Sequence, residues 1–136
     1  MRVGITFSSF DLLHASHLVM LKESKKQCDH LILGLQLDPS IDKSNKNGPS
    51  ESIIERYIRL KDSKYVDEIV PYVSEQDVED TLRSFKIDIR IIIEEYKTID
   101  FIGKEYCTEK GIEIYYSSTE DRSSSTEIKT RLKKIN

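Results

Sequence analysis

The chain has 136 residues, enough for one domain with a sizeable core, so we expect residues 1–136 to form a single domain. Charged residues make up 33% and hydrophobic residues 38%, a balance that excludes an intrinsically disordered chain. The net charge of -3 argues against a nucleic-acid-binding protein, which normally carries a basic excess. A nucleotide enzyme needs only a local basic patch and stays compatible with this charge.

The sequence also bears on location and redox state. No apolar run approaches the length of a membrane span, and no signal-like segment precedes Arg2, so we expect a cytoplasmic protein without membrane contact. Cys28 and Cys107 lack the spacing of metal ligands and are interpreted as reduced, partly buried thiols. His30 is also interpreted as structural. No metal site made by the protein alone is predicted.

The first half of the chain alternates between strand and helix. The almost continuous apolar run of the second strand is typical of a parallel strand buried on both faces. In the first helix we expect Leu18 and Leu21 to face inward, with Met20 as a further candidate, and Ser50 or Ser52 to cap the next helix. The expected elements are a strand over Val3–Phe7, a helix over His17–Lys26, a strand over His30–Leu37, a loop over Asp38–Ser50 and a helix over Ile53–Asp62.

Capping residues mark the helices of the second half. Ser74 with Asp77 approximates a capping box, and Gly111 closes a helix in the position after its last residue. The expected elements are a strand over Tyr65–Tyr72, a helix from Ser74 to about Phe85, a strand over Asp88–Ile93, a helix over Phe101–Lys110, a strand over Ile112–Tyr116, a Ser/Thr-rich turn over Ser117–Thr126 and a helix over Glu127–Lys134.

Strands that alternate with helices imply parallel pairing and right-handed crossovers. The sequence therefore predicts an α/β fold, a Rossmann-like, doubly wound sheet of five parallel strands. Ligands of such sheets bind at the carboxyl ends of the strands, where the strand order reverses, and the first turn between strand and helix is the usual place. In this chain that turn carries two histidines.

His14 and His17 lie three residues apart where the first helix begins, so they would share one face. A helix N-terminus has unpaired N–H groups and the positive end of the helix dipole, and both attract phosphate. Histidines would add donors that carry charge near neutral pH. The pattern H-x-x-H also arises by accident, with one histidine capping the helix and the other exposed. Spacing alone leaves both interpretations open.

The sequence of residues 8–17 resembles the G-x-F-D-x-x-H-x-G-H signature of the nucleotidyltransferase superfamily that includes glycerol-3-phosphate cytidylyltransferase. Ser8 and Ser16 stand where the family has glycine, which it uses where the backbone closely approaches a ligand or adopts unusual angles. These two changes could alter how closely the backbone approaches a phosphate. They do not affect the H-x-x-H nucleotidyltransferase fold that the resemblance implies. The positions that match are Phe10, Asp11, His14 and His17.

The resemblance extends over essentially the whole chain. The segment Arg59–Pro71, with its core Lys64–Pro71, looks like the family segment that enters the third strand, and Glu55-Arg56 matches an E-R pair on the preceding helix. Lys46 lies in the loop where the family places lysines that reach the triphosphate. Without the resemblance, the E-R pair reads as a solvated helix face, and a lysine in a loop is commonplace.

Two later segments also resemble parts of the family site. Glu95 and Tyr96 follow the fourth strand at the family's G-x-D-[WY] position, where Ile93 replaces the glycine. Without a role in the site, these residues would simply point to solvent at the end of a strand. The last turn lacks the family's leading R-T. Arg122 resembles the arginine of a variant of this turn, and a Ser/Thr run follows it. Such a turn would be a second phosphate cradle, although a plain serine-rich surface loop also fits. The matching run is Ser124, Ser125 and Thr126.

The resemblance implies a cytidylyltransferase that joins CTP to a phosphorylated alcohol, such as glycerol 3-phosphate, with Mg2+ accompanying the nucleotide. It assigns catalytic roles at the α-phosphate to His14 and His17 and triphosphate binding to Lys46 and Arg122. A homodimer is expected by analogy. An adenylyltransferase using ATP, or a nucleotide-binding module with reduced turnover, stays open. The nucleotide-binding residues implied are Ser8, Ser9, Phe10, Asp11, Glu95, Tyr96, Ser124, Ser125 and Thr126.

Overall fold

The computed structural model of the chain describes residues 1–13, 15–38 and 48–117. The helix expected over Glu127–Lys134 and most of the turn before it lie outside the described residues. The elements are β1 (Val3–Ser8), α1 (Ala15–Lys26), β2 (His30–Gln36), α2 (Ile53–Lys61), β3 (Glu68–Tyr72), α3 (Glu75–Ser84), β4 (Ile89–Ile93), the 3-10 helix η2 (Glu94–Thr98), α4 (Lys104–Lys110) and β5 (Glu113–Ser117).

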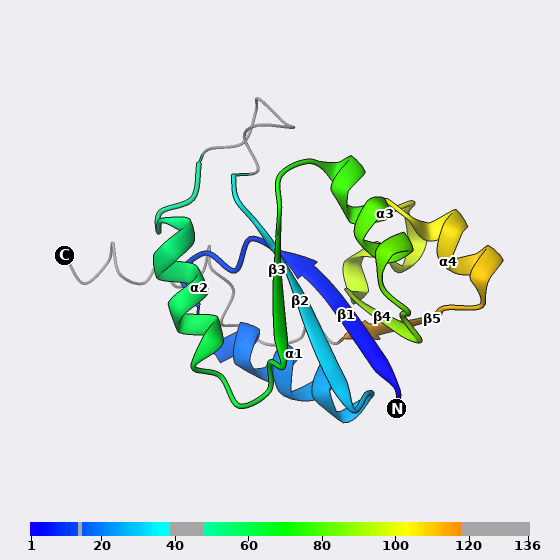
Figure 1. The fold of residues 1–136 in the computed structure, drawn as a ribbon, viewed down its shortest axis with the longest axis horizontal. Coiled ribbons are helices and arrows are strands. Elements are labelled where there is room, and N and C mark those ends of the chain that lie inside the picture. Colours follow the sequence, from blue (N-terminus) through cyan, green and yellow to red (C-terminus); the bar gives the residue numbers. More distant parts are fainter. Residues whose placement is uncertain (14, 39–47, 118–136) are drawn as a thin grey trace.

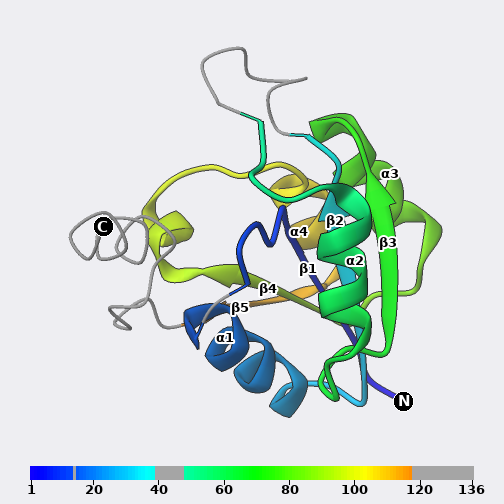
Figure 2. The same ribbon diagram turned by 90° about the vertical axis from the view of Figure 1, so that its left-hand side faces the viewer.

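The strands form one five-stranded sheet in the order β3-β2-β1-β4-β5, and every neighbouring pair is parallel. The chain builds outward from β1 to β3 on one side, and then returns to place β4 and β5 on the other. Figures 1 and 2 show α1 and α2 over one face of the sheet and α3 and α4 over the other. The expected doubly wound α/β sheet is confirmed, and its switch point lies between β1 and β4.

The core consists of two apolar layers, one on each face of the sheet. Leu21 of α1 and Leu60 of α2 are fully buried against one face, and Leu82 of α3 and Cys107 of α4 against the other. The central strands are buried on both faces, as their continuous apolar run predicts. Burying one such leucine side chain stabilises the fold by about 1.5–3 kcal/mol. Both cysteines are free.

The first helix is rotated relative to the prediction. Leu21 is buried as expected and Met20 is partly buried, but Leu18 is 44% exposed, so its inward placement was wrong. The buried face of α1 continues through Ser24. Its hydroxyl donates a hydrogen bond to the carbonyl of Met20 at 2.7 Å, so this buried polar group has a partner within the helix. A buried polar residue with its own partner therefore takes the place that the pattern assigned to Leu18.

Two other elements begin three residues later than expected. β3 starts at Glu68 and not at Tyr65, because the Asp67 carboxylate accepts the backbone N–H of Leu31 at 2.8 Å and ends the preceding turn there. α4 starts at Lys104 and not at Phe101, because Gly103 has a φ of 85°. That left-handed conformation cannot continue a helix and suits glycine. None of the helices in the described part of the chain has the length and apolar character that crossing a bilayer requires.

β3 forms one edge of the sheet and contains a proline, Pro71. The backbone N–H of Leu37 donates to the carbonyl of Tyr72 at 2.9 Å, so the backbone groups of Tyr72 point toward the rest of the sheet. Successive residues of a strand point their backbone groups in opposite directions. The nitrogen of Pro71 therefore points to the open side of β3.

Candidate functional site

The candidate site is built on the turn between β1 and α1, which we call the first turn (residues 9–13). It leaves the carboxyl end of β1 at the switch point of the sheet. His17 lies in the first helical turn of α1, where its ring meets the buried ring of Phe10 edge to face, with centroids 5.7 Å apart. The sequence prediction that this histidine lies at the helix start is confirmed. His14 lies outside the described residues.

The backbone of the first turn is strained at two positions. Phe10 has a φ of 49° and Leu12 a φ of 51°, in the left-handed region that residues with a side chain rarely adopt. Each such residue costs about 1–2 kcal/mol. Phe10 is nonetheless 1% exposed, so burial of its ring offsets part of that cost. Strain of this kind persists only where the surroundings hold the backbone in place.

Ser8 shows no such strain. It is the last residue of β1 and pairs with Leu35 of β2 in extended backbone. Its hydroxyl accepts the N–H of Phe10 at 3.3 Å. A glycine is therefore not required at this position by backbone conformation, and serine contributes a contact to the turn.

The segment 50–56 holds the first turn through two carboxylates. Asp11 accepts the backbone N–H groups of Ser50 at 2.8 Å and of Glu51 at 2.9 Å. Glu51, 6% exposed, accepts the N–H of Leu12 at 2.8 Å, and its second oxygen pairs with Arg59 of α2 at 2.7 Å. We call this set of contacts the brace. It joins positions that are about forty residues apart in the chain.

Arg56 of α2 adds further contacts to the brace. Its side chain is 1% exposed, and Nη1 donates to the carbonyl of Ser9 at 2.8 Å. The same guanidinium also donates to the carbonyls of Gln36, Leu37 and Glu51. It thus ties the first turn to the end of β2 and the start of α2. The alternative interpretation of Arg56 as part of a solvated helix face is wrong, because the side chain is buried and donates four hydrogen bonds to backbone carbonyls.

The neighbour of Arg56 has a different function. Glu55 is exposed and forms a capping box with Ser52, in which the N–H of Glu55 donates to the serine hydroxyl and the N–H of Ser52 to the carboxylate, each at 3.1 Å. Ser52, one of the two residues expected to cap this helix, is its N-cap. The E-R pair therefore contains one residue that starts α2 and one that fixes the first turn.

Across the switch point, β4 runs directly into η2, which contains Glu95 and Tyr96. The backbone of these two residues lies at the carboxyl end of β4, where the sequence places them, and their side chains lie outside the described part of the structure. The loop after η2, residues 99–103, leads into α4. This loop is the second segment that could approach a ligand at the switch point.

A second buried arginine holds that loop. Arg90 of β4 is 6% exposed and lies between the rings of Phe7 and Phe101, 5.1 and 4.9 Å from their centroids. Its Nη1 donates to the carbonyl of Ile102, and its Nε has no hydrogen-bond partner. Burial lowers the pKa of the guanidinium, and burial also raises the pKa of the neighbouring Cys107 thiol. No pattern in the sequence indicated this cluster.

The structure brings five of the predicted site residues together in or beside the first turn, and it does not test their roles: Ser8, Ser9, Phe10, Asp11 and His17. Lys64 lies in the turn before β3, at the amino ends of the parallel strands, whereas the first turn lies at their carboxyl ends. The described residues contain no cluster of three or more side chains placed to hold a metal ion. Predicted residues outside the described ranges are His14, Lys46, Arg122, Ser124, Ser125 and Thr126.

Comparison of the sequence with known families and proteins gives consistent matches. Residues 5–131 match the family described as Cytidylyltransferase-like. The chain is 33% identical to glycerol-3-phosphate cytidylyltransferase of Bacillus spizizenii over 132 residues, which cover 95% of each chain. It is 27% identical to the bifunctional protein HldE of Caulobacter vibrioides over 97% of this chain, but it spans only 27% of the length of that protein.

Solved structures support the same fold. A lipopolysaccharide core biosynthesis protein from Thermoplasma volcanium superimposes with a TM-score of 0.68 at 25% identity, covering 87% of this chain and 95% of its own. A pantoate-beta-alanine ligase from Francisella tularensis has a TM-score of 0.63 at 15% identity, covering 95% of this chain and 65% of its own. At that identity the second likeness concerns the fold alone.

Proposed function

The chain belongs to the cytidylyltransferase-like family, and from that premise we propose that it transfers CMP from CTP to a small phosphorylated alcohol, with release of pyrophosphate. Membership confirms the family resemblance of the first turn and the expectation of an enzyme of nucleotidyl transfer. The match over 95% of a glycerol-3-phosphate cytidylyltransferase supports glycerol 3-phosphate as the acceptor to test first. We further propose a cytoplasmic homodimer.

One observation carries the proposal: the braced first turn delivers His17 and the N-terminus of α1 to the switch point of a parallel sheet. α1 has 12 residues, and the N–H groups of its first turn and its dipole attract an anion. A nucleotide phosphate is the anion that such a site at a switch point binds in α/β proteins. Family membership supports nucleotidyl transfer as the reaction, and the position of the first turn at the switch point supports this turn as the nucleotide site.

In the proposed reaction a phosphate oxygen of the alcohol attacks the α-phosphorus of CTP in line. The bond from the α-phosphorus to the bridging oxygen breaks, and pyrophosphate leaves with its electron pair. Such a reaction needs positioning and stabilisation of charge more than covalent chemistry from the protein. We assign the stabilisation of charge at the α-phosphate to His14 and His17, and the grip on the leaving pyrophosphate to Lys46 and Arg122.

The described contacts assign Asp11 a positioning role. Both of its carboxylate oxygens accept backbone N–H groups of Ser50 and Glu51, just before α2. Together with the bond from the N–H of Leu12 to Glu51, these contacts hold the strained backbone of the first turn in place, which would lower the ordering cost of binding a ligand. Mg2+ bound to the triphosphate would neutralise part of its charge, and it typically needs only one or two carboxylates beyond the phosphates and water.

Pyrophosphate release tests the proposal directly. The full chain is assayed with CTP or ATP, each with glycerol 3-phosphate, and the variants are His17→Ala and a matched control, His30→Ala. His30 pairs with Glu68 at the amino ends of the strands, away from the site. We expect release with CTP, a fall in turnover on the order of 10²-fold in His17→Ala, and no change in His30→Ala.

Two results would overturn it. Faster release with ATP than with CTP would make the chain an adenylyltransferase. Binding of CTP, measured by calorimetry, without release for any phosphorylated alcohol would make it a nucleotide-binding module with little turnover. Turnover of His17→Ala within about twofold of the wild type would remove the role assigned to the histidine.

A further inference from the structure

The two strands at the switch point, β1 and β4, pair over only part of their length. β1 pairs with β2 at every one of its residues. Among the described residues, it pairs with β4 only at Gly4 and Ile5. If that register continued, Ser8 would lie opposite Ile93, and these are the last residues of the two strands. Ser8 and Ile93 therefore flank the switch point where the strands no longer pair.

The side chain of Ile93 points to the side of the sheet that carries α1. Successive side chains of a strand alternate between the two faces. Ile89 and Ile91 belong to the same apolar layer as Phe10, on the face that α1 covers. Ile93 comes two residues after Ile91 and is 38% exposed. A partly open apolar side chain thus lies on the same side of the sheet as the first turn.

Isoleucine at this position differs from the glycine of the family signature in volume and not in backbone conformation. Among the described residues other than glycine, only Phe10 and Leu12 have a positive φ, so the backbone at Ile93 does not call for glycine. The side chain of Ile93 therefore fills space that a glycine would leave empty. Ser8, across the switch point, also stands where the family has glycine.

The brace occupies the opposite side of the first turn. Arg56 joins Ser9 to the end of β2, and Asp11 joins the turn to the segment before α2. A nucleotide with its phosphates at the N-terminus of α1 cannot place its nucleoside where these groups lie. Its nucleoside would extend away from the brace, over the carboxyl end of β4 and past Ile93.

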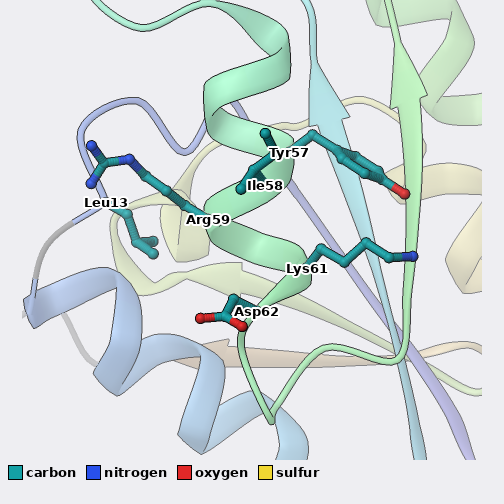
Figure 3. Close-up of a pocket in the computed structure, with 6 residues that line it drawn as sticks. All are labelled: Leu13, Tyr57, Ile58, Arg59, Lys61 and Asp62. Atoms are coloured by element: carbon teal, nitrogen blue, oxygen red, sulfur yellow. The ribbon is translucent and has the colours of Figure 1, made fainter.

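A hollow of about 660 Å³ beside α2 is the alternative place for a nucleoside. Figure 3 shows Tyr57 and Lys61 extending from one side of α2, and Arg59 extending from the other side near Leu13. All of its described lining residues come from α2, from Asp62 after it, or from the first turn, and none comes from β1 or β4. The hollow therefore lies away from the switch point.

We propose that Ile93 contacts the nucleoside of the bound nucleotide and limits the size of its base, so that the single ring of a pyrimidine is favoured over the fused rings of a purine. This role rests on the proposed function, because it takes a nucleotide as the ligand. The flat face of a base suits an apolar partner, since their contact removes apolar surface from water. The fused rings would have to displace a side chain that is branched at Cβ and therefore stiff.

The nucleotide preference of the full chain tests this role. The variants are Ile93→Ala, the conservative Ile93→Val and a matched control, Val73→Ala. Val73 is also 38% exposed, but it follows β3 at the edge of the sheet, away from β4. For each protein, kcat/KM is measured by pyrophosphate release with CTP and with ATP, each with glycerol 3-phosphate.

We expect Ile93→Ala to lower the preference for CTP over ATP by at least about tenfold, through a rise in kcat/KM with ATP. A gain with ATP is a result that a loss of stability alone does not produce. Ile93→Val keeps the branch at Cβ and should retain most of the preference. Val73→Ala should stay within about twofold of the wild type.

Two results would overturn the role of Ile93 and leave the proposed function in place. They are release with CTP at an unchanged preference in Ile93→Ala, and an equal change in Val73→Ala. Calorimetry with CTP and ATP gives a separate answer when no pyrophosphate is released. A wild type that binds CTP more tightly than ATP, and an Ile93→Ala variant that loses this difference, would keep the role of Ile93 and refute the proposed function. A wild type that prefers ATP would refute both.

Discussion

Two buried guanidinium groups hold the two loops at the carboxyl end of the sheet, and they do so with different partners. Arg56, beneath the first turn, donates to four backbone carbonyls. Arg90, beneath the loop after η2, donates to one carbonyl, that of Ile102, and lies between the rings of Phe7 and Phe101 with its Nε unpartnered. Among the described residues, neither has a carboxylate partner.

The difference shows what replaces water around a buried charge. Carbonyl oxygens take over the hydrogen bonds that water made, so little of the desolvation cost of Arg56 persists. Aromatic faces attract the charge of Arg90 but leave one of its donors unsatisfied. We therefore expect the first turn to be the more rigid of the two loops, and the loop after η2 to yield first when stability falls.

The largest effect should come from Arg56→Met. The change leaves four buried or partly buried carbonyls without their donor, and we expect the free energy of unfolding to fall by about 3–5 kcal/mol in urea titrations. Arg56→Lys is the control, because one ammonium keeps the charge but cannot span the same set of carbonyls, and it should recover only part of the loss. A loss under about 1 kcal/mol would mean that water reaches these carbonyls easily.

A smaller loss is expected for Glu51→Gln. The amide keeps one oxygen for the N–H of Leu12 but gives up the charged contact with Arg59, at a cost of about 1.5–3 kcal/mol. Glu79→Gln is a matched control, because Glu79 pairs with Arg83 on the surface of α3 and should lose only about 0.3–0.5 kcal/mol. Equal losses in the two variants would show that the brace is no stronger than a surface ion pair.

Arg90→Met should change the free energy of unfolding least of the three variants. Methionine fills a similar volume between Phe7 and Phe101 and removes a buried charge, so the free energy of unfolding should change by about 1 kcal/mol or less. Hydrogen exchange should nevertheless speed up at residues 99–103, because the carbonyl of Ile102 loses its donor. A loss as large as that of Arg56→Met would remove the distinction between the two groups.

Much of the fold follows from local patterns. The nearly continuous apolar run of β2 predicts a strand that is buried on both faces. The structure places β2 next to the central strand of a parallel sheet, as this pattern requires. The phase of α1 does not follow, because Leu18, Val19, Met20 and Leu21 are consecutive apolar residues and fit several helical faces. Packing against the sheet chose the face with Leu21 and Ser24.

The site divides in a similar way. The first turn was located by its sequence, because the motif with His17 and the carboxyl end of a strand point to the same place. The brace could not be predicted from spacing, because Asp11 and Glu51 meet only in the folded chain. Arginine is normally exposed, so a buried Arg56 contradicts its usual preference. The positive φ of Phe10 could not be predicted either, because phenylalanine rarely adopts this conformation.

Pro71 has a consequence for behaviour at high protein concentration. The open side of a sheet is a template on which strands of other molecules can assemble, and such growth leads to aggregates. The nitrogen of Pro71, the fourth residue of a five-residue strand, faces that open side and has no hydrogen to donate. An added strand would lack a bond there, so β3 resists ribbon-like growth.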